Sequence, residues 1–299
     1  MLTTYLCGKK LKSPIILGSG TLGEKKEPLI KALNFGAGAV VNRTLRVGSN
    51  RKIFKPAYYF GEKTYMLNAD NKNVTPWEYW VRKAKEVEKY GPLIISLSAR
   101  IPKDCDIIVS AFEENYSPSF YELNFSCSHS AKIYGKISYE QVEESLRLIR
   151  KKTKKPIFLK LSLDNMDFKQ LNNIEKWING YVLSNTIGPG LKIDINSRRP
   201  VLGSTFGGVS GGAIKPLVLA GIYELKHHTK KTIIGVGGIE TAEDILEYLI
   251  LGCDAIQIYT KAHREGIEVF KKLNDDLKNL LNKMNETVET IKGTFNYGK

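Results

Sequence analysis

The sequence predicts an α/β fold in which eight parallel strands close into a (β/α)8 TIM barrel. Short apolar runs alternate with amphipathic stretches, eight such runs are present, and several are apolar almost without interruption. Alternating strands and helices indicate a parallel sheet, and strands covered on both faces have nearly continuous apolar sequences. An open, doubly wound sheet is the alternative architecture for this pattern.

The strand candidates are short and rich in β-branched and other apolar residues. They cover residues 13–18, 37–44, 92–98, 120–126, 156–162, 180–186, 232–238 and 255–260. Helices between them are expected where apolar residues recur at three- and four-residue spacing, at residues 139–151, 168–179, 216–228 and 241–251. The charged stretch from residue 265 to about residue 281 is expected to form the eighth helix with an extension.

Two long segments are predicted to be loops over the C-terminal face of the barrel. Residues 187–213 contain seven glycines and show no helical period, and residues 45–75 form another long excursion. Structureless connections of this length are usually functional. No repeat or linker-like tract divides the chain, so residues 1–299 are expected to form one domain.

The composition, with 42% hydrophobic residues, is that of a globular protein. No apolar run approaches the roughly 20 residues of a membrane span, and the first residues lack the apolar core of a signal peptide. We therefore expect a soluble, cytoplasmic protein. The four cysteines are widely spaced without a Cys-x-x-Cys pair, which argues against a zinc or iron–sulfur site and favours free thiols.

A formal charge of +14 raises the question of a nucleic-acid partner. The cations are dispersed, however, and a local group at residues 151–155 falls at a predicted helix end, where cations are favoured. We interpret the charge as solvated surface and do not expect a nucleic-acid interface.

The active site of such a barrel lies at the C-terminal ends of the strands. The seventh strand ends in Gly237 and Gly238, and the eighth ends in Tyr259 and Thr260. Glycines let backbone N–H groups approach a phosphate closely, and the next helix would add its positive dipole end. This pattern favours a phosphate site, although the glycines alone would also suit a tight turn.

Lys160 lies inside the fifth strand between two leucines, where an unpaired charge would be costly. An anionic ligand in the barrel mouth would compensate it, and an ion pair with Glu122 of the neighbouring strand is the alternative. The fourth strand runs to Cys127 and His129, which suits proton transfer if a nearby cation such as Arg43 or Lys160 lowers the pKa of the thiol. A small buried side chain and a surface histidine are the structural alternatives for these two residues.

Six stretches of the chain resemble the class 1 dihydroorotate dehydrogenases, and the resemblance covers nearly the whole sequence. They are Ile16-Leu-Gly-Ser-Gly-Thr-Leu-Gly23, Glu122-Leu-Asn-Phe-Ser-Cys127, Ser184-Asn-Thr-Ile-Gly188, Arg199-Pro200, Gly207-Gly-Val-Ser-Gly-Gly-Ala-Ile-Lys-Pro216 and Gly235-Val-Gly-Gly-Ile-Glu-Thr-Ala-Glu-Asp244. The likeness is strongest to the B-type branch, whose members work with an electron-transfer subunit.

This resemblance implies an FMN-dependent oxidation of dihydroorotate to orotate in pyrimidine (UMP) biosynthesis. Cys127 would remove the proton at C5 while hydride passes from C6 to flavin N5. The implied substrate-binding residues are Arg43, Asn68, Asn124, His129, Asn185 and Thr186. The implied cofactor-binding residues are Ser19, Gly20, Arg43, Thr44, Lys160, Gly208, Ser210, Gly211, Gly237, Gly238, Tyr259 and Thr260.

The B-type resemblance also implies a partner subunit with FAD and an iron–sulfur cluster, NAD as the distal acceptor, and a homodimer at the core of a heterotetramer. Three places depart from the family pattern: Arg43 replaces a lysine, His129 an asparagine, and Asp70-Asn71-Lys72 an apolar-Gly-Leu run. An arginine fork and a titratable ring differ chemically from lysine and asparagine. A flavoprotein similar to the tRNA-dihydrouridine synthases, and a non-catalytic flavin-binding partner subunit, are the alternatives.

Overall fold

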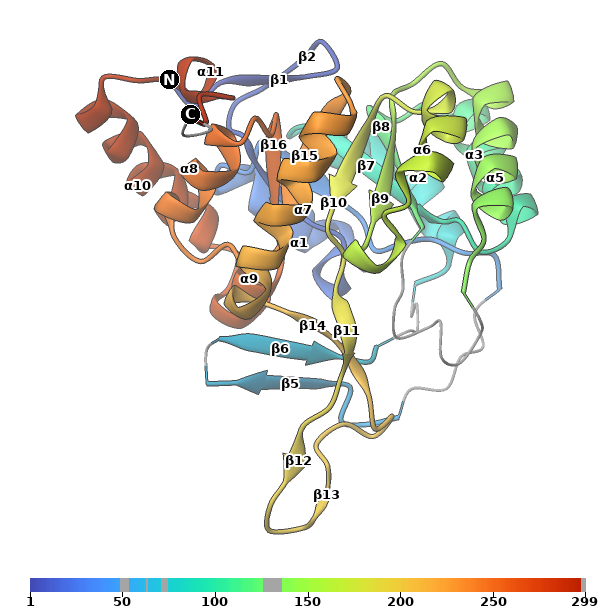
Figure 1. Cartoon of the computed structure of the whole chain (residues 1–299). Helices are drawn as coiled ribbons and strands as arrows, with labels where there is room; N and C mark the ends of the chain where they lie inside the picture. The colour runs from blue at the N-terminus through green and yellow to red at the C-terminus, as the bar shows by residue number, and fades with distance from the viewer. Residues whose placement is uncertain (49–53, 63, 71–74, 126–135, 297–299) are drawn as a thin grey trace.

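The barrel is present in the computed structural model, which describes residues 1–48, 54–62, 64–70, 75–125 and 136–296 (Figure 1). In this part of the chain, eight parallel strands close into a barrel whose spatial order follows the sequence. They are β3 (Ile15–Leu17), β4 (Ala39–Val41), β7 (Leu93–Ser98), β8 (Phe120–Asn124), β9 (Ile157–Leu161), β10 (Gly180–Leu183), β15 (Thr232–Val236) and β16 (Ala255–Ile258). Because β16 pairs with β3, the sheet is closed and the doubly wound alternative is wrong.

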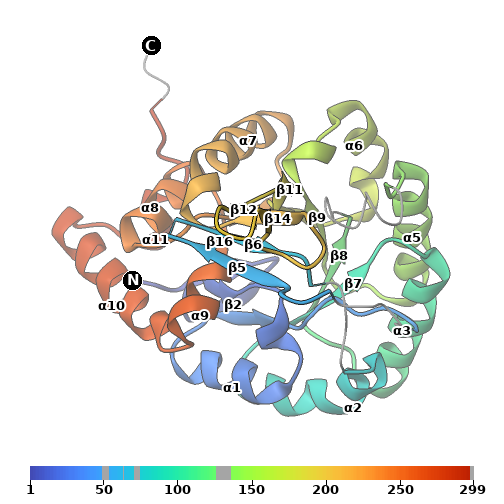
Figure 2. The same ribbon diagram turned by 90° about the horizontal axis from the view of Figure 1, so that it is seen from below.

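Helices form the outer ring around the strands, as the view along the barrel shows (Figure 2). They are α1 (Lys26–Asn34), α2 (Trp77–Glu88), α3 (Pro102–Asn115), α5 (Tyr139–Lys152), α6 (Phe168–Ile174), α7 (Lys215–His228), α8 (Ala242–Ile250), α9 (Thr260–Glu265), α10 (Val269–Met284) and α11 (Val288–Ile291). No described helix is both long and apolar enough to cross a membrane.

Two predicted helices have different bounds in the structure. The helix expected at residues 168–179 ends at Ile174 and continues only as the 3-10 turn η3 (Glu175–Trp177). The stretch from residue 265 does not begin a helix, because Gly266 has a φ of +96° and ends α9 before α10 starts at Val269.

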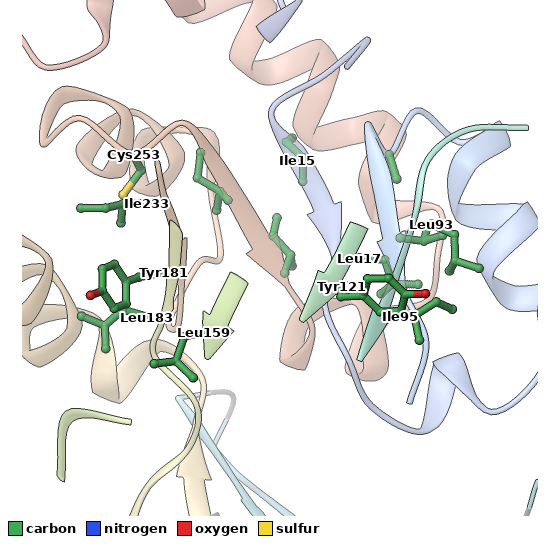
Figure 3. Packing of buried hydrophobic residues seen from close by; sticks show 14 of the residues in the cluster. Ile15, Leu17, Leu93, Ile95, Tyr121, Leu159, Tyr181, Leu183, Ile233 and Cys253 are labelled. Atoms are coloured by element: carbon green, nitrogen blue, oxygen red, sulfur yellow. The ribbon is translucent and has the colours of Figure 1, made fainter. Parts of the chain in front are cut away.

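Alternation along the strands divides the core into two layers. Ile16 of β3 packs with residues such as Phe120 and Phe158 inside the barrel, whereas its neighbours Ile15 and Leu17 belong to the larger cluster between strands and helices. Figure 3 shows Ile15 and Leu17 within that larger cluster. The β1 (Thr4–Leu6) and β2 (Lys9–Leu11) hairpin adds its leucines to the inner cluster and covers the N-terminal end of the barrel.

The two segments predicted to be loops contain strands. The described parts of these segments form an antiparallel sheet in the order β11 (Ile187–Gly190), β14 (Gly207–Ser210), β6 (Tyr65–Asn68) and β5 (Tyr58–Gly61). A small hairpin of β12 (Ile193–Asp194) and β13 (Arg199–Pro200) extends beyond it. Figure 1 places this sheet at the end of the barrel opposite the β1–β2 hairpin. It therefore covers the face on which the strands end.

Candidate active site

A cleft lies between the C-terminal ends of the barrel strands and the β5–β6–β14 part of the covering sheet. The predicted residues that line it are Ser19, Gly20, Arg43, Thr44, Asn68, Asn124, Lys160, Asn185, Thr186, Ser210, Gly211, Gly237, Gly238, Tyr259 and Thr260. Gly208 lies in β14, paired with Asn68, and a Cβ added to it would come within 2.2 Å of Thr186 Oγ1. Cys127 and His129 lie outside the described residues.

The cleft also has lining residues that the sequence reasoning did not select. They include Thr21, Arg46, Tyr58, Met66, Glu240 and Gln257. Gln257 carried a usable signal, because it is a polar residue within the apolar strand β16, as Lys160 is within β9. Tyr58 and Met66 come from the covering sheet, which the sequence did not predict.

The floor of the cleft contains the cation of Lys160. Its Nζ donates to Gln257 Oε1 at 2.9 Å and lies 3.7 Å from Glu122 Oε1. Glu122 Oε2 accepts from Gln257 Nε2 at 2.8 Å, which closes a buried triangle of side chains. The alternative of a Lys160–Glu122 ion pair is thus present in the structure, and Lys160 still lines the cleft.

A row of amides and hydroxyls runs along one side of the cleft. Asn185 Nδ2 donates to Asn124 Oδ1, and Asn124 Nδ2 donates to Thr44 Oγ1, each at 3.2 Å. Thr44 Oγ1 is 3.3 Å from Ser19 Oγ. Amides offer both donors and acceptors, so this row can match the edge of a planar ligand that carries N–H and C=O groups.

Arg43 lies at the edge of the cleft between two carboxylates. Its Nη1 is 2.8 Å from Glu24 Oε1, and its Nη2 is 3.0 Å from Asp70 Oδ1. Burial alone would lower the pKa of Arg43, but the two carboxylates outweigh burial and raise it. Tyr58 donates to Asp70 Oδ2 at 2.6 Å, and burial together with this carboxylate raises the pKa of Tyr58.

Another part of the cleft lining consists of glycine backbone together with Tyr259 and Thr260. Gly237 and Gly238 have φ values of +139° and +70°, in the region that favours glycine. A Cβ added to Gly20 would lie 2.1 Å from the Tyr259 ring. Thr260 Oγ1 donates to Ser210 Oγ at 2.9 Å and joins β14 to this end of the barrel. Such glycine turns fit a phosphate with its connecting chain.

The cysteines within the described residues are free thiols, namely Cys7, Cys105 and Cys253. Burial raises the pKa of Cys105 to about 12, and it raises the pKa of Cys253 as well. A raised pKa keeps a thiol protonated, and only the thiolate is reactive. We therefore interpret these two side chains as part of the packed core. These two cysteines are therefore poor candidates for a base.

The chain is similar to a known protein family over nearly its whole length. The family model described as Dihydroorotate dehydrogenase matches residues 1–281. A relative from Thermoplasma acidophilum is 33% identical over 280 residues, which are 91% of each chain. One from Methanocaldococcus jannaschii is 30% identical over 302 residues, covering 98% of this chain and 97% of the relative. One from Pyrococcus abyssi is 32% identical over 287 residues, 94% of each chain.

All three relatives are named as the catalytic subunit of dihydroorotate dehydrogenase B (NAD(+)). The family match extends over all eight barrel strands and both segments that build the covering sheet. This chain belongs to the dihydroorotate dehydrogenase family of oxidoreductases.

Proposed function

We propose that this protein is the FMN-binding catalytic subunit of a B-type dihydroorotate dehydrogenase and oxidises dihydroorotate to orotate in pyrimidine biosynthesis. The observation that supports this best is the cleft itself. One cleft combines the Lys160 cation, a row of amides and glycine-lined backbone. The cation suits a flavin ring that gains negative charge on reduction, the amides suit a planar pyrimidine, and the glycine backbone suits a phosphate.

The described residues fit FMN. Glycine at position 20 lets the backbone lie directly against the cleft-lining Tyr259 ring, and Gly237 and Gly238 form a turn at positive φ whose backbone lines the same cleft. We assign the flavin contacts to Ser19, Gly20, Arg43, Thr44, Lys160, Gly208, Ser210, Gly211, Gly237, Gly238, Tyr259 and Thr260. FMN would supply the acceptor for the hydride that leaves C6 of dihydroorotate.

The protein residues would bind and orient the pyrimidine. Asn68, Asn124, Asn185 and Thr186 would hydrogen-bond the ring amides, with Arg43 and His129 as further substrate contacts. Cys127 would act as the base that takes the C5 proton. A positioned base contributes typically 10²–10⁴-fold to a rate, so the loss of Cys127 would slow the reaction without removing the binding site.

The names of the relatives support a partner as well. They are called catalytic subunits of an NAD(+)-linked enzyme, so we propose a separate subunit with FAD and an iron–sulfur cluster that passes electrons to NAD. A homodimer of this chain would form the core of that complex. The same names favour dihydroorotate over the RNA substrate of a dihydrouridine synthase.

Anaerobic stopped-flow absorbance tests this proposal. The purified protein is mixed with dihydroorotate, and the visible flavin band is followed in wild type, Cys127→Ser and Cys7→Ser. Cys7 is the matched control because it is exposed in the turn between β1 and β2, at the other end of the barrel.

Fast bleaching in wild type and Cys7→Ser, with bleaching slowed by about 10²-fold or more in Cys127→Ser, is expected. Bound FMN that stays oxidised in wild type would reject dihydroorotate as the substrate. An unchanged rate in Cys127→Ser would remove Cys127 from the role of base.

A further inference from the structure

Glu122 is a buried carboxylate to which the proposed reaction assigns no role. It lies in β8 with none of its surface exposed. Its Oε1 accepts from Ser96 Oγ at 3.0 Å, and its Oε2 accepts from Gln257 Nε2 at 2.8 Å. Both oxygens of Glu122 thus have hydrogen-bond partners, and the Lys160 cation lies 3.7 Å from Oε1, which is the kind of partner a buried carboxylate needs.

The orientation of the Gln257 amide follows from the charge of Lys160. The ammonium group of Lys160 has only donors, so the atom of Gln257 that faces it at 2.9 Å must be the carbonyl oxygen. The amide nitrogen of Gln257 then faces Glu122, whose Oε2 accepts from it. The amide of Gln257 thus bridges the two side chains, and Glu122 Oε1 lies 3.7 Å from Lys160 Nζ.

The three side chains come from different parts of the barrel. Glu122 and Lys160 belong to the neighbouring strands β8 and β9. Gln257 belongs to β16, which is separated from β8 by three other strands in the closed sheet. The triangle therefore spans the barrel interior. A buried ion pair linked by an amide in this way is strongly held, because breaking it would leave an uncompensated charge.

The three side chains of the triangle differ in their access to the cleft. Lys160 and Gln257 line the cleft, while Glu122 is completely buried beside them. A ligand at the floor of the cleft would contact the Lys160 cation and the Gln257 amide. It would also interact electrostatically with the Glu122 carboxylate through the low-dielectric interior of the barrel. Charges there interact more strongly than in water.

Resting on the function proposed above, we propose that Glu122 is a positioning residue that sets the reduction potential of the bound flavin. It holds the Lys160 cation at the cleft floor and offsets part of its charge. Lys160 alone would favour the reduced flavin, which carries more negative charge than the oxidised form. Glu122 opposes this preference, so that electrons taken from the substrate can be passed on to the next acceptor.

The test is the reduction potential of the bound FMN in Glu122→Gln, measured by anaerobic reductive titration against a reference dye. Glutamine has nearly the same shape but lacks the charge. We expect the affinity for reduced over oxidised flavin to rise about tenfold or more, which for two electrons raises the potential by about 30 mV. An unchanged or lower potential would overturn the proposal.

Two further variants separate charge from packing. Ser96→Ala removes one hydrogen bond to Glu122 but keeps both charges, so its potential should stay close to that of wild type. Lys160→Met should lower the potential. In the double variant Glu122→Gln/Lys160→Met the two shifts should not add, because neighbours in one network are coupled. A shift in Ser96→Ala as large as in Glu122→Gln would contradict a charge effect.

Glu122→Met provides the same test if the glutamine variant does not fold, because it removes the same charge with a side chain of similar volume that adapts to irregular space and needs no hydrogen-bond partner. The outcomes also distinguish the two proposals. A wild-type protein without flavin, or with flavin that dihydroorotate does not reduce, would reject the proposed function. A wild type that dihydroorotate bleaches, with no potential shift in either Glu122 variant, would reject only the role of Glu122.

Discussion

Asp70 Oδ1 lies 3.0 Å from Arg43 Nη2, and this ion pair connects the residues that follow β6 and β4. Both side chains are nearly buried, at 8% and 11% exposure. Glu24 binds the other side of the guanidinium, and its second oxygen accepts from the backbone N–H of Thr75. Two carboxylates therefore surround one cation at the edge where an anionic substrate would bind.

We predict that Asp70→Asn increases the affinity for orotate by about three- to tenfold. The exchange removes one negative charge from the cleft edge, and a unit charge about 10 Å from the ligand contributes on the order of 1 kcal/mol at an effective dielectric constant of about 20. Asparagine can still accept the hydrogen bond of Tyr58, and Glu24 still binds Arg43. Titration with orotate, followed by the change in the flavin spectrum, measures this affinity.

Asp194→Asn is the matched control, because Asp194 is exposed in the β12–β13 hairpin. The same charge is removed there without a change at the cleft edge, so orotate binding should stay at the wild-type value. Weaker binding in Asp70→Asn would show that Asp70 mainly holds Arg43 in place for the substrate.

The barrel could be predicted because each of its strands has a local signal. An apolar run such as residues 157–161, followed by a polar or glycine residue and an amphipathic helix, defines both the strand and the end that faces the cleft. Lys160, Asn124 and Asn185 were found in this way, because strand ends of a barrel converge.

The covering sheet had no such signal. Gly207 and Gly208 of β14 have low strand propensity, yet β14 pairs with β6, whose residues lie more than a hundred positions earlier in the chain. Pairing over that distance depends on how the closed barrel places both segments. The contribution of Tyr58 to the cleft and the Asp70–Arg43 ion pair follow from this pairing and were therefore missed.

Gly238→Ala is predicted to weaken FMN binding by at least about tenfold. Gly238 has a φ of +70°, where an alanine costs roughly 1–2 kcal/mol. The added Cβ would also lie 2.5 Å from the Cβ and 2.8 Å from the backbone nitrogen of Lys215. The turn must then move away from the place assigned to the phosphate. Titration of the apoprotein with FMN, followed by fluorescence quenching, measures the loss.

Gly8→Ala is the control that has the same backbone strain at a position away from the cleft. Gly8 has a φ of +81°, and no atom of the described residues lies within 4 Å of an added Cβ. It follows β1, at the end of the barrel away from the cleft. This variant should lose only the roughly 1–2 kcal/mol that the positive φ costs an alanine, and it should bind FMN normally. Equal weakening in both variants would show that the effect is global and not local to the phosphate turn.

Asp244 stabilises the same turn through its charge. Its Oδ2 accepts from the backbone N–H groups of Glu240 and Thr241 at 2.7 and 2.8 Å, and its Oδ1 accepts from Lys215 Nζ. Burial alone would raise the pKa of Asp244, but the hydrogen bonds from Lys215 and the two backbone groups outweigh burial and lower it. The ionised form is therefore favoured by the folded state.

Asp244→Asn should lower the free energy of unfolding at pH 7 by about 1–3 kcal/mol, the usual range for hydrogen bonds to a charged group. Since the folded-state pKa is the lower one, this contribution is complete above the unfolded value of about 4 and disappears as the pH falls through the folded value. Urea unfolding of wild type and variant at several pH values measures the difference. Asp275→Asn, which breaks an exposed pair with Lys271, should cost less than about 1 kcal/mol. A loss in Asp244→Asn that stays constant below pH 4 would mean that shape, and not charge, is what Asp244 contributes to the turn.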